Sequence, residues 1–208
     1  MKKLALLYIV LLIITGCEKK LDDQIIDNLP IDTSFCDNFP LENSTLKDSV
    51  DYAIINSVLE CFYTNEDSIH FKQSTNYGVG IENIEMTLSY RNIDFDSSLL
   101  SDYKTKNTNS YILTDSLLSK SVTLISQQEL TCIFNFEDAG WEKYYEKYPK
   151  SGGFLSFYCP GINMQGNKAI VEYGHFINYL GAMGFIVMLE KTNNNWDITH
   201  RINTWISK

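Results

Sequence analysis

The last third of the chain has a pattern that is typical of β-strands. Gly184–Lys191 is apolar on both faces, which predicts a strand in the middle of a sheet. Thr192–Asn195 is a turn sequence, and Trp196–His200 alternates after it, with Trp196, Ile198 and His200 on one face. These segments predict a β-hairpin with Trp196 buried, and Trp205-Ile206 is expected to close the core.

Other segments predict further strands and short helices. Strands are expected at Phe154–Tyr158 and Asn167–His175, which are bounded by turn residues. Shorter strands are expected at Ile69–Gln73 and Ser121–Ile125. Short helices are expected at Ser97–Lys106, in the segment after Ser126, and at Trp141–Tyr148. Ile81–Met86 fits either a strand or a helix.

An amphipathic helix is predicted near the start of the folded part. Ser44 or Thr45 can cap it, and it is expected to end near Tyr63. Its apolar side recurs at spacings of three and four, at Val50, Ala53, Ile54, Ser57, Val58, Cys61 and Phe62. The predicted fold class is α+β, with this N-terminal amphipathic helix and the short helices packed on a C-terminal antiparallel sheet of four or more strands.

Residues 1–17 have the organisation of an export signal. Lys2 and Lys3 precede an apolar run from Leu4 to Ile14, and small residues lead to Cys17. The run is shorter than the roughly 20 apolar residues of a membrane span. Its end is similar to the lipobox of bacterial lipoproteins, and that resemblance implies cleavage before Cys17 and acylation of this cysteine. An ordinary secreted protein with a chance cysteine at this position is the alternative.

The chain is predicted to have three regions. Residues 1–16 are expected to be a lipoprotein signal peptide, 17–43 a lipid-anchored flexible tether, and 44–208 a single α+β domain. The tether is favoured because Glu18–Asn43 is polar and acidic, contains two prolines and has no sustained period. Cys36 leaves an alternative open, since a disulfide through it would pin part of this segment to the domain.

Four cysteines follow Cys17, namely Cys36, Cys61, Cys132 and Cys159. An exported protein meets an oxidising compartment that allows disulfides, and four cysteines permit three full pairings. The sequence does not choose among these pairings, and free buried thiols are an equal alternative. No cysteine and histidine cluster has zinc spacing, so no metal site is predicted.

The net charge of -9 at pH 7 restricts the partners. Loss of the signal removes Lys2 and Lys3 and no acidic residue, so the mature chain is more acidic still. This charge argues against nucleic acid as a partner and against electrostatic docking on an anionic membrane face. The expected membrane attachment is the lipid at Cys17, because acyl chains bind a bilayer regardless of net charge. The oligomeric state stays open.

Several short segments, spread over most of the mature chain, occur in the same order as in a known group of proteins. They are Asp102–Asn107, Trp141, Tyr148–Gly152, Phe154–Asn163, Lys168–Tyr173, Gly181–Phe185, Asn194–Ile198 and Trp205–Ser207. In this order they are similar to a group of uncharacterised exported bacterial proteins, many of them Bacteroidota lipoproteins. Ile162 departs from the pattern, since an aromatic residue is expected there. The resemblance implies one α+β domain in the cell envelope and nothing catalytic.

The histidines do not form a recognisable catalytic constellation. His175 shares its strand face with Tyr173 rather than with Glu172, and His70 and His200 lie in other predicted strands. A general base needs an aimed partner and a substrate within hydrogen-bond reach, and the sequence identifies neither. The chain also lacks GxSxG, HExxH and a phosphate-binding glycine loop. No catalytic residue and no cofactor are therefore predicted, and the histidines are interpreted as surface or core residues.

Two further patterns have a functional and a structural interpretation. Asp94, Asp96 and Asp102 suggest calcium, but the glycine and glutamate of an EF-hand loop are missing, which favours a solvated polar loop. Trp141, Tyr145 and Tyr148 form an aromatic row on one face of a short helix. Such rows can bind carbohydrate, but packing of the helix on a sheet is the favoured interpretation.

The sequence therefore favours a non-enzymatic lipoprotein of the bacterial cell envelope, placed in the outer membrane, that binds a protein, a glycan or another envelope component. Two alternatives stay open: a small hydrolase whose site is assembled from distant residues, and an inhibitor or immunity lipoprotein. A deep polar cleft with converging acids or His175 would favour the hydrolase, whereas an exposed apolar patch would favour binding.

Overall fold

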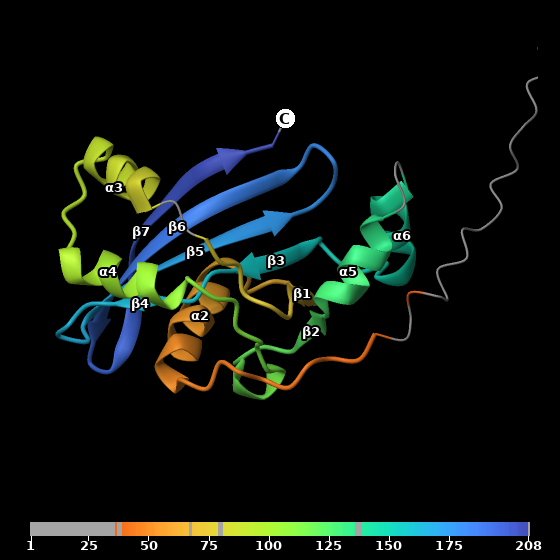
Figure 1. The fold of residues 1–208 in the computed structure, drawn as a ribbon, viewed down its shortest axis with the longest axis horizontal. Coiled ribbons are helices and arrows are strands. Elements are labelled where there is room, and N and C mark those ends of the chain that lie inside the picture. The colour runs from red at the N-terminus through yellow and green to blue at the C-terminus, as the bar shows by residue number, and fades with distance from the viewer. Residues whose placement is uncertain (1–35, 37–38, 67, 79–80, 136–138, 208) are drawn as a thin grey trace, which may run out of the picture. The chain divides into compact units, whose positions relative to one another are not determined.

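A seven-stranded mixed sheet organises the structure (Figure 1). The computed structural model describes residues 36, 39–66, 68–78, 81–135 and 139–207. The strands are β1 (Ile69–Lys72), β2 (Val122–Ile125), β3 (Phe154–Phe157), β4 (Gly161–Ile162), β5 (Lys168–Phe176), β6 (Ala182–Thr192) and β7 (Asn195–Ile206). Their order across the sheet is β2-β1-β3-β5-β6-β7, and β4 also pairs with β5.

The described residues also form five α-helices and one 3₁₀ turn. They are α2 (Ser49–Phe62), α3 (Ile81–Tyr90), α4 (Ser97–Lys106), α5 (Gln127–Phe134) and α6 (Gly140–Lys147), with η2 at Asp115–Leu117. The predicted α+β fold class is confirmed. Ser126 caps α5 as predicted, because its hydroxyl accepts the N–H of Glu129 at 3.1 Å. The segment that fitted either helix or strand is the start of α3.

The sheet contains both parallel and antiparallel pairs. β1 is parallel to β2 and to β3, whereas the pairs β3–β5, β5–β6 and β6–β7 are antiparallel. The predicted antiparallel sheet is thus present, and the two short predicted strands extend it as a parallel edge. A parallel pair needs a long crossover, and the connection from β1 to β2 contains α3 and α4.

The start of α2 corrects one prediction. The helix is capped by Asp48, whose carboxylate accepts the N–H of Val50 at 2.8 Å, and not by Ser44 or Thr45. The Ser44 hydroxyl instead donates to the carbonyl of Ile112, and the Thr45 hydroxyl accepts the N–H of the same residue. These bonds hold the segment before α2 against a distant part of the chain, so the helix starts later than predicted.

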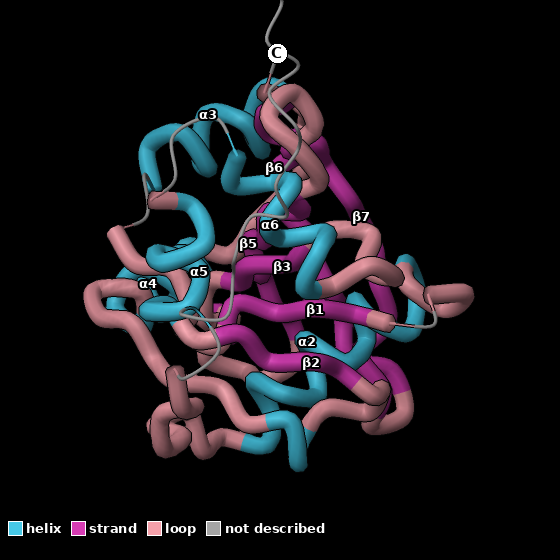
Figure 2. The backbone as a smooth tube through the Cα atoms, turned by 90° about the vertical axis from the view of Figure 1, so that its right-hand side faces the viewer, coloured by secondary structure: helices cyan, strands magenta, loops and turns pink. Residues whose placement is uncertain are grey.

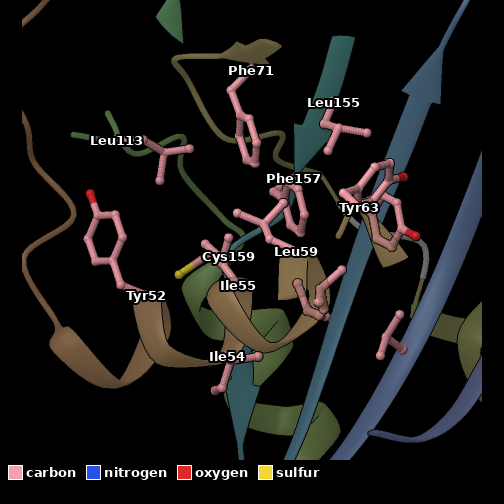
Figure 3. Close-up of a cluster of buried hydrophobic side chains, with 14 of the residues drawn as sticks. Tyr52, Ile54, Ile55, Leu59, Tyr63, Phe71, Leu113, Leu155, Phe157 and Cys159 are labelled. Atoms are coloured by element: carbon pink, nitrogen blue, oxygen red, sulfur yellow. The ribbon is translucent and has the colours of Figure 1, made fainter. Parts of the chain in front are cut away.

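α2 covers one face of the sheet, where the largest core cluster lies (Figure 3). Ile55 and Leu59 of α2 lie beside Phe157 of β3, whose ring stacks on Phe71 of β1 with 5.2 Å between the ring centroids. Each fully buried side chain of this size contributes roughly 1.5–3 kcal/mol relative to an exposed one. The buried stripe of α2 differs from the predicted one, since Ala53 and Cys61 are exposed while Tyr52, Ile55 and Leu59 are buried.

Two helix pairs cover the opposite face of the sheet. Leu88 of α3 and Leu99 of α4 pack in a cluster with residues of β5, β6 and β7. Tyr144 of α6 packs in another cluster with Ile125 of β2 and Phe154 of β3. Figure 1 shows α3 and α4 over one end of the sheet and α5 and α6 over the other, and Figure 2 shows the same sheet from its β2 edge.

The β6–β7 hairpin confirms the predicted turn and the burial of Trp196. Asn193 and Asn194 at the turn have φ of 50° and 69°, as a tight hairpin turn of the mirror-image type requires. Trp196 is 6% exposed and belongs to the core cluster under α2. β6 lies between β5 and β7, which agrees with its apolar character on both faces.

Two irregularities in the β6–β7 pair correct the predictions for the later residues of β7. The register moves between Met188↔His200 and Leu189↔Ile198, which leaves Thr199 as an extra residue. His200 therefore does not continue the face of Trp196, and it is exposed. The expectation that Trp205-Ile206 closes the core is also wrong, because these side chains are 38% and 59% exposed.

The predicted tether extends too far along the chain. Cys36 forms a disulfide with Cys132 of α5, and its carbonyl accepts the Lys147 ammonium at 3.0 Å. The N–H of Glu42 donates to the side chain of Gln73 at 3.0 Å. The domain therefore includes residues before 44, because these bonds fix parts of the 17–43 segment. Cys61 is free and exposed, and Cys159 is free and buried, so none of the three full pairings forms.

The predicted signal peptide 1–16, Cys17 and the tether residues up to 35 lie outside the described residues. None of the helices in the described part of the chain is long and apolar enough to cross a membrane.

Candidate functional site

The three histidines occupy different places on the sheet. His175 lies on the same face as Tyr173, as predicted, and both contact Tyr63, with ring centroids 5.7 Å and 6.3 Å away. His70 lies against the rings of α6, 4.8 Å from that of Tyr148. Burial lowers the pKa of both His70 and His175. His200 stands apart from both, exposed on the edge strand β7.

His70 and His175 nevertheless line one small cavity, which the sequence did not predict. Its other lining residues include Tyr63, Glu66 and Gly152, and its volume is about 20 Å³. The His175 Nε2 atom lies 3.0 Å from the carbonyl oxygen of Gly152. A space of this size holds one water molecule. The cavity beside the two histidines is therefore far smaller than a typical small-molecule site.

The two patterns with alternative interpretations have structural roles. Asp96 caps α4 by accepting the N–H of Ser98 at 2.8 Å, and Asp102 accepts the N–H of Ile162 at 2.8 Å. In the described part of the chain, no group of three or more histidine, cysteine or acidic side chains could hold a metal ion. Trp141 is 9% exposed and stacks on Phe154 of β3, so the aromatic row packs its helix on the sheet.

A buried polar cluster joins α2 to α4. The Lys106 ammonium lies 2.9 Å from one carboxylate oxygen of Asp51. The Cys159 thiol lies 3.6 Å from the other carboxylate oxygen of Asp51. Burial and the nearby Asp51 charge raise the pKa of the Cys159 thiol, which keeps it protonated and unreactive. Burial also raises the pKa of Asp51, and the hydrogen bond from Lys106 opposes that effect. This cluster ties α2 to α4.

The main candidate site is a cleft between α3 and the sheet, here called the α3 cleft. Its volume is about 340 Å³, which is at the lower end of the range for small-ligand sites. It is lined by Asn83, Ile84, Met86 and Thr87 of α3, Tyr158 after β3, Glu172 of β5, Ile186 of β6, and Thr204 and Trp205 of β7. Five separate segments thus contribute to one hollow.

The register of the sheet places Trp205 at this cleft. Ser156, Gly174, Gly184 and Trp205 are successive Cα partners across β3, β5, β6 and β7. A Cβ atom on Gly184 would lie 1.9 Å from Nε1 of Trp205, so the indole ring rests directly on the glycine backbone. Because the glycines have no side chains, the indole ring of Trp205 can lie flat on the sheet. Trp205 is 38% exposed there.

Glu172 provides the carboxylate of the cleft. The Tyr103 hydroxyl donates to its Oε2 atom at 3.4 Å. Burial raises the pKa of Glu172, and the hydrogen bond from Tyr103 opposes this with a smaller effect. Burial and the Glu172 charge together raise the pKa of Tyr158, which stays a neutral hydroxyl. The cleft therefore offers a carboxyl group and a phenol in a partly desolvated setting.

Thr204 adds a hydroxyl with unused bonding capacity. Its Oγ1 atom is buried and has no hydrogen-bond partner among the described residues. A buried polar atom without a partner costs roughly 1–3 kcal/mol. The residue lies at the second irregularity of the β6–β7 pair, between Asn203 and Trp205 in the register. The irregularity thus brings Thr204 and Trp205 to the same cleft.

The arrangement suits binding better than acid–base chemistry. Glu172 is the only carboxylate among the described side chains that line the α3 cleft, and no histidine or cysteine lines it. Most glycoside hydrolases use two opposed carboxyl groups, and nucleophilic catalysis commonly uses a nucleophile beside a base. What remains is an aromatic surface with hydrogen-bonding groups around it.

A wider hollow lies between α2 and the β6–β7 turn. Its volume is about 780 Å³, and Glu60, Cys61 and Asn195 are among its lining residues. Most of its lining side chains are exposed, so the hollow offers few desolvated groups. The smaller α3 cleft is therefore the stronger candidate.

The sequence does not predict this site. It places Trp205 in the core, and it gives no functional signal for Glu172, Thr204 or Asn83. Gly174 and Gly184 within predicted strands were the available clue, because an interior glycine often marks a close approach by another group. Only the strand register shows that these two glycines are direct partners on neighbouring strands.

The chain matches no family model, no curated protein sequence and no solved structure.

Proposed function

We propose that this protein is a non-enzymatic binding lipoprotein of the bacterial cell envelope. In this proposal the lipid on Cys17 anchors it to the outer membrane, and the α3 cleft holds its ligand. The observation that carries the binding role is the composition of the cleft: an exposed indole ring, a carboxyl group and an unpaired hydroxyl meet in one hollow. The anchor is supported by the lipobox-like end of the N-terminal segment.

The hydrolase alternative lacks a comparable observation. His175 lies in the 20 Å³ cavity on the α2 face, whereas Glu172 lies in the cleft on the opposite face. No second acid approaches Glu172 among the described residues of the cleft lining. We therefore do not assign a reaction.

The anchor is tested by changing the cysteine at position 17. The Cys17→Ala variant should abolish incorporation of labelled fatty acid and leave uncleaved or mislocalised precursor, because acylation and cleavage both depend on this thiol. The measurement is fatty-acid labelling in growing cells, followed by the intact mass of the purified protein. Cys61→Ser, which changes another exposed cysteine, is the control and should be labelled like the wild type. Wild-type protein without an acyl group would contradict the proposed anchor.

A further inference from the structure

The indole ring of Trp205 forms a fixed, flat surface in the α3 cleft. Gly184 supports it from below, and the ring of Phe176 lies beside it with 5.9 Å between the centroids. Any side chain at Gly184 would displace the ring, as the 1.9 Å approach indicates. An aromatic ring held in this way is pre-organised to stack on a flat or puckered ring, because little conformational entropy is lost on binding.

Hydrogen-bonding groups of both kinds surround this ring. Glu172 offers acceptor oxygens, the Thr204 and Tyr158 hydroxyls can donate or accept, and the amide of Asn83 can do both. Thr204 Oγ1 is buried and has no partner among the described residues, so a ligand reaches it only when the threonine side chain turns toward the cleft. A ligand that matches these groups must carry several hydroxyls or amides around an apolar face.

The charge of the cleft disfavours anionic ligands. No lysine or arginine is among the described residues that line it, and its single ionisable acid is Glu172. The whole chain carries a net charge of -9, which repels phosphate and carboxylate groups further. The Tyr103 hydroxyl already donates a hydrogen bond to the Glu172 carboxyl, so fewer of its acceptor positions are left for a cation.

We propose that the ligand of the α3 cleft is a neutral saccharide of one or two rings that stacks on Trp205. This inference rests on the proposed binding function and names its ligand class. The apolar face of a sugar ring lies on the indole, and the hydroxyls at its edge bond to Glu172, Thr204 and Asn83. A cleft of about 340 Å³ accommodates a short saccharide rather than a long chain.

Tryptophan fluorescence of the mature lipidated protein tests this inference. The detergent should be a sugar-free amine oxide, and the probes should be maltose, cellobiose and N,N′-diacetylchitobiose. Trp141 and Trp196 are 9% and 6% exposed, so Trp205 is the indole that a ligand reaches. We expect at least one of these sugars to change the emission, and we expect calorimetry to give its affinity.

Three variants separate the cleft from the rest of the surface. Trp205→Ala should weaken saccharide binding at least tenfold, since the stacking surface is lost. Thr204→Val removes one hydroxyl with little change of shape and should weaken binding by about twofold to tenfold. Tyr77→Ala removes an exposed aromatic ring that does not line the cleft and should bind like the wild type. Circular dichroism of each variant verifies that it is folded.

Two results would overturn the saccharide inference. The first is a lack of binding to all three neutral sugars, and the second is equal binding by the folded Trp205→Ala or Thr204→Val variant and the wild type. Choline, glucuronate and decanoate serve as cationic, anionic and lipid probes. If one of these binds in a Trp205-dependent way and the sugars do not, the ligand class is wrong while the binding role of the cleft stands.

Discussion

Replacing Cys36 and Cys132 together by serine should lower the free energy of unfolding by about 4–5 kcal/mol. The bond joins residues that are 96 positions apart, so it removes much of the conformational freedom of the unfolded chain. Cys36 is 1% exposed, and Phe39 packs against the same cluster. The variant should therefore also free the segment around these residues. Urea unfolding of oxidised wild type and of the double variant measures the difference.

Two comparisons make the disulfide prediction specific. Reduced wild type should unfold like the double variant, because both lack the same bond. Cys61→Ser should unfold like oxidised wild type, because Cys61 is free and exposed. Equal midpoints for the oxidised wild type and the double variant would mean that the bond does not constrain the unfolded chain.

Trp196→Ala should lower the free energy of unfolding by about 3–5 kcal/mol, which is a large part of the stability of a typical domain. Trp196 is 6% exposed in the cluster under α2, and Lys191 places its ammonium 5.7 Å from the ring centroid. Its loss leaves a cavity in the core that the surrounding strands fill only in part. Thermal and urea unfolding of the variant measure the effect.

Trp205→Ala is the matched control for the Trp196 prediction. Both changes remove an indole from β7, but Trp205 is 38% exposed at the cleft and should cost clearly less stability. An equal loss in the two variants would show that Trp205 is a core residue and that the α3 cleft is not an open site.

Most of the elements could be predicted from local pattern. Helix α4 spans the predicted Ser97–Lys106, and Ser126 caps α5, because short polar side chains at helix starts carry a strong local signal. The β6–β7 hairpin followed from alternation around an asparagine turn. The start of α2 was misplaced because Ser44 and Thr45 bond to Ile112, a contact across the chain that no local pattern encodes.

The site could not be predicted because it depends on register. Alternation along β7 was extended past Thr199, but the extra residue there changes the face, and a second irregularity lies before Trp205. The row from Gly174 to Gly184 to Trp205 exists only once three strands are paired. The disulfide was likewise open in the sequence, since nothing local joins Cys36 to Cys132.

The central claim is that the anchored protein binds its ligand through the α3 cleft, and site-specific photo-crosslinking in living cells tests it most directly. A photoreactive residue at Met86 would stand on the cleft lining, where the native side chain is 64% exposed. One at Tyr77, which is 67% exposed and does not line the cleft, is the control. Intact-mass analysis of the mature protein should detect an adduct at Met86 alone, and this adduct should disappear when Trp205→Ala is added. The same adducts from both positions, or none from Met86, would contradict the account.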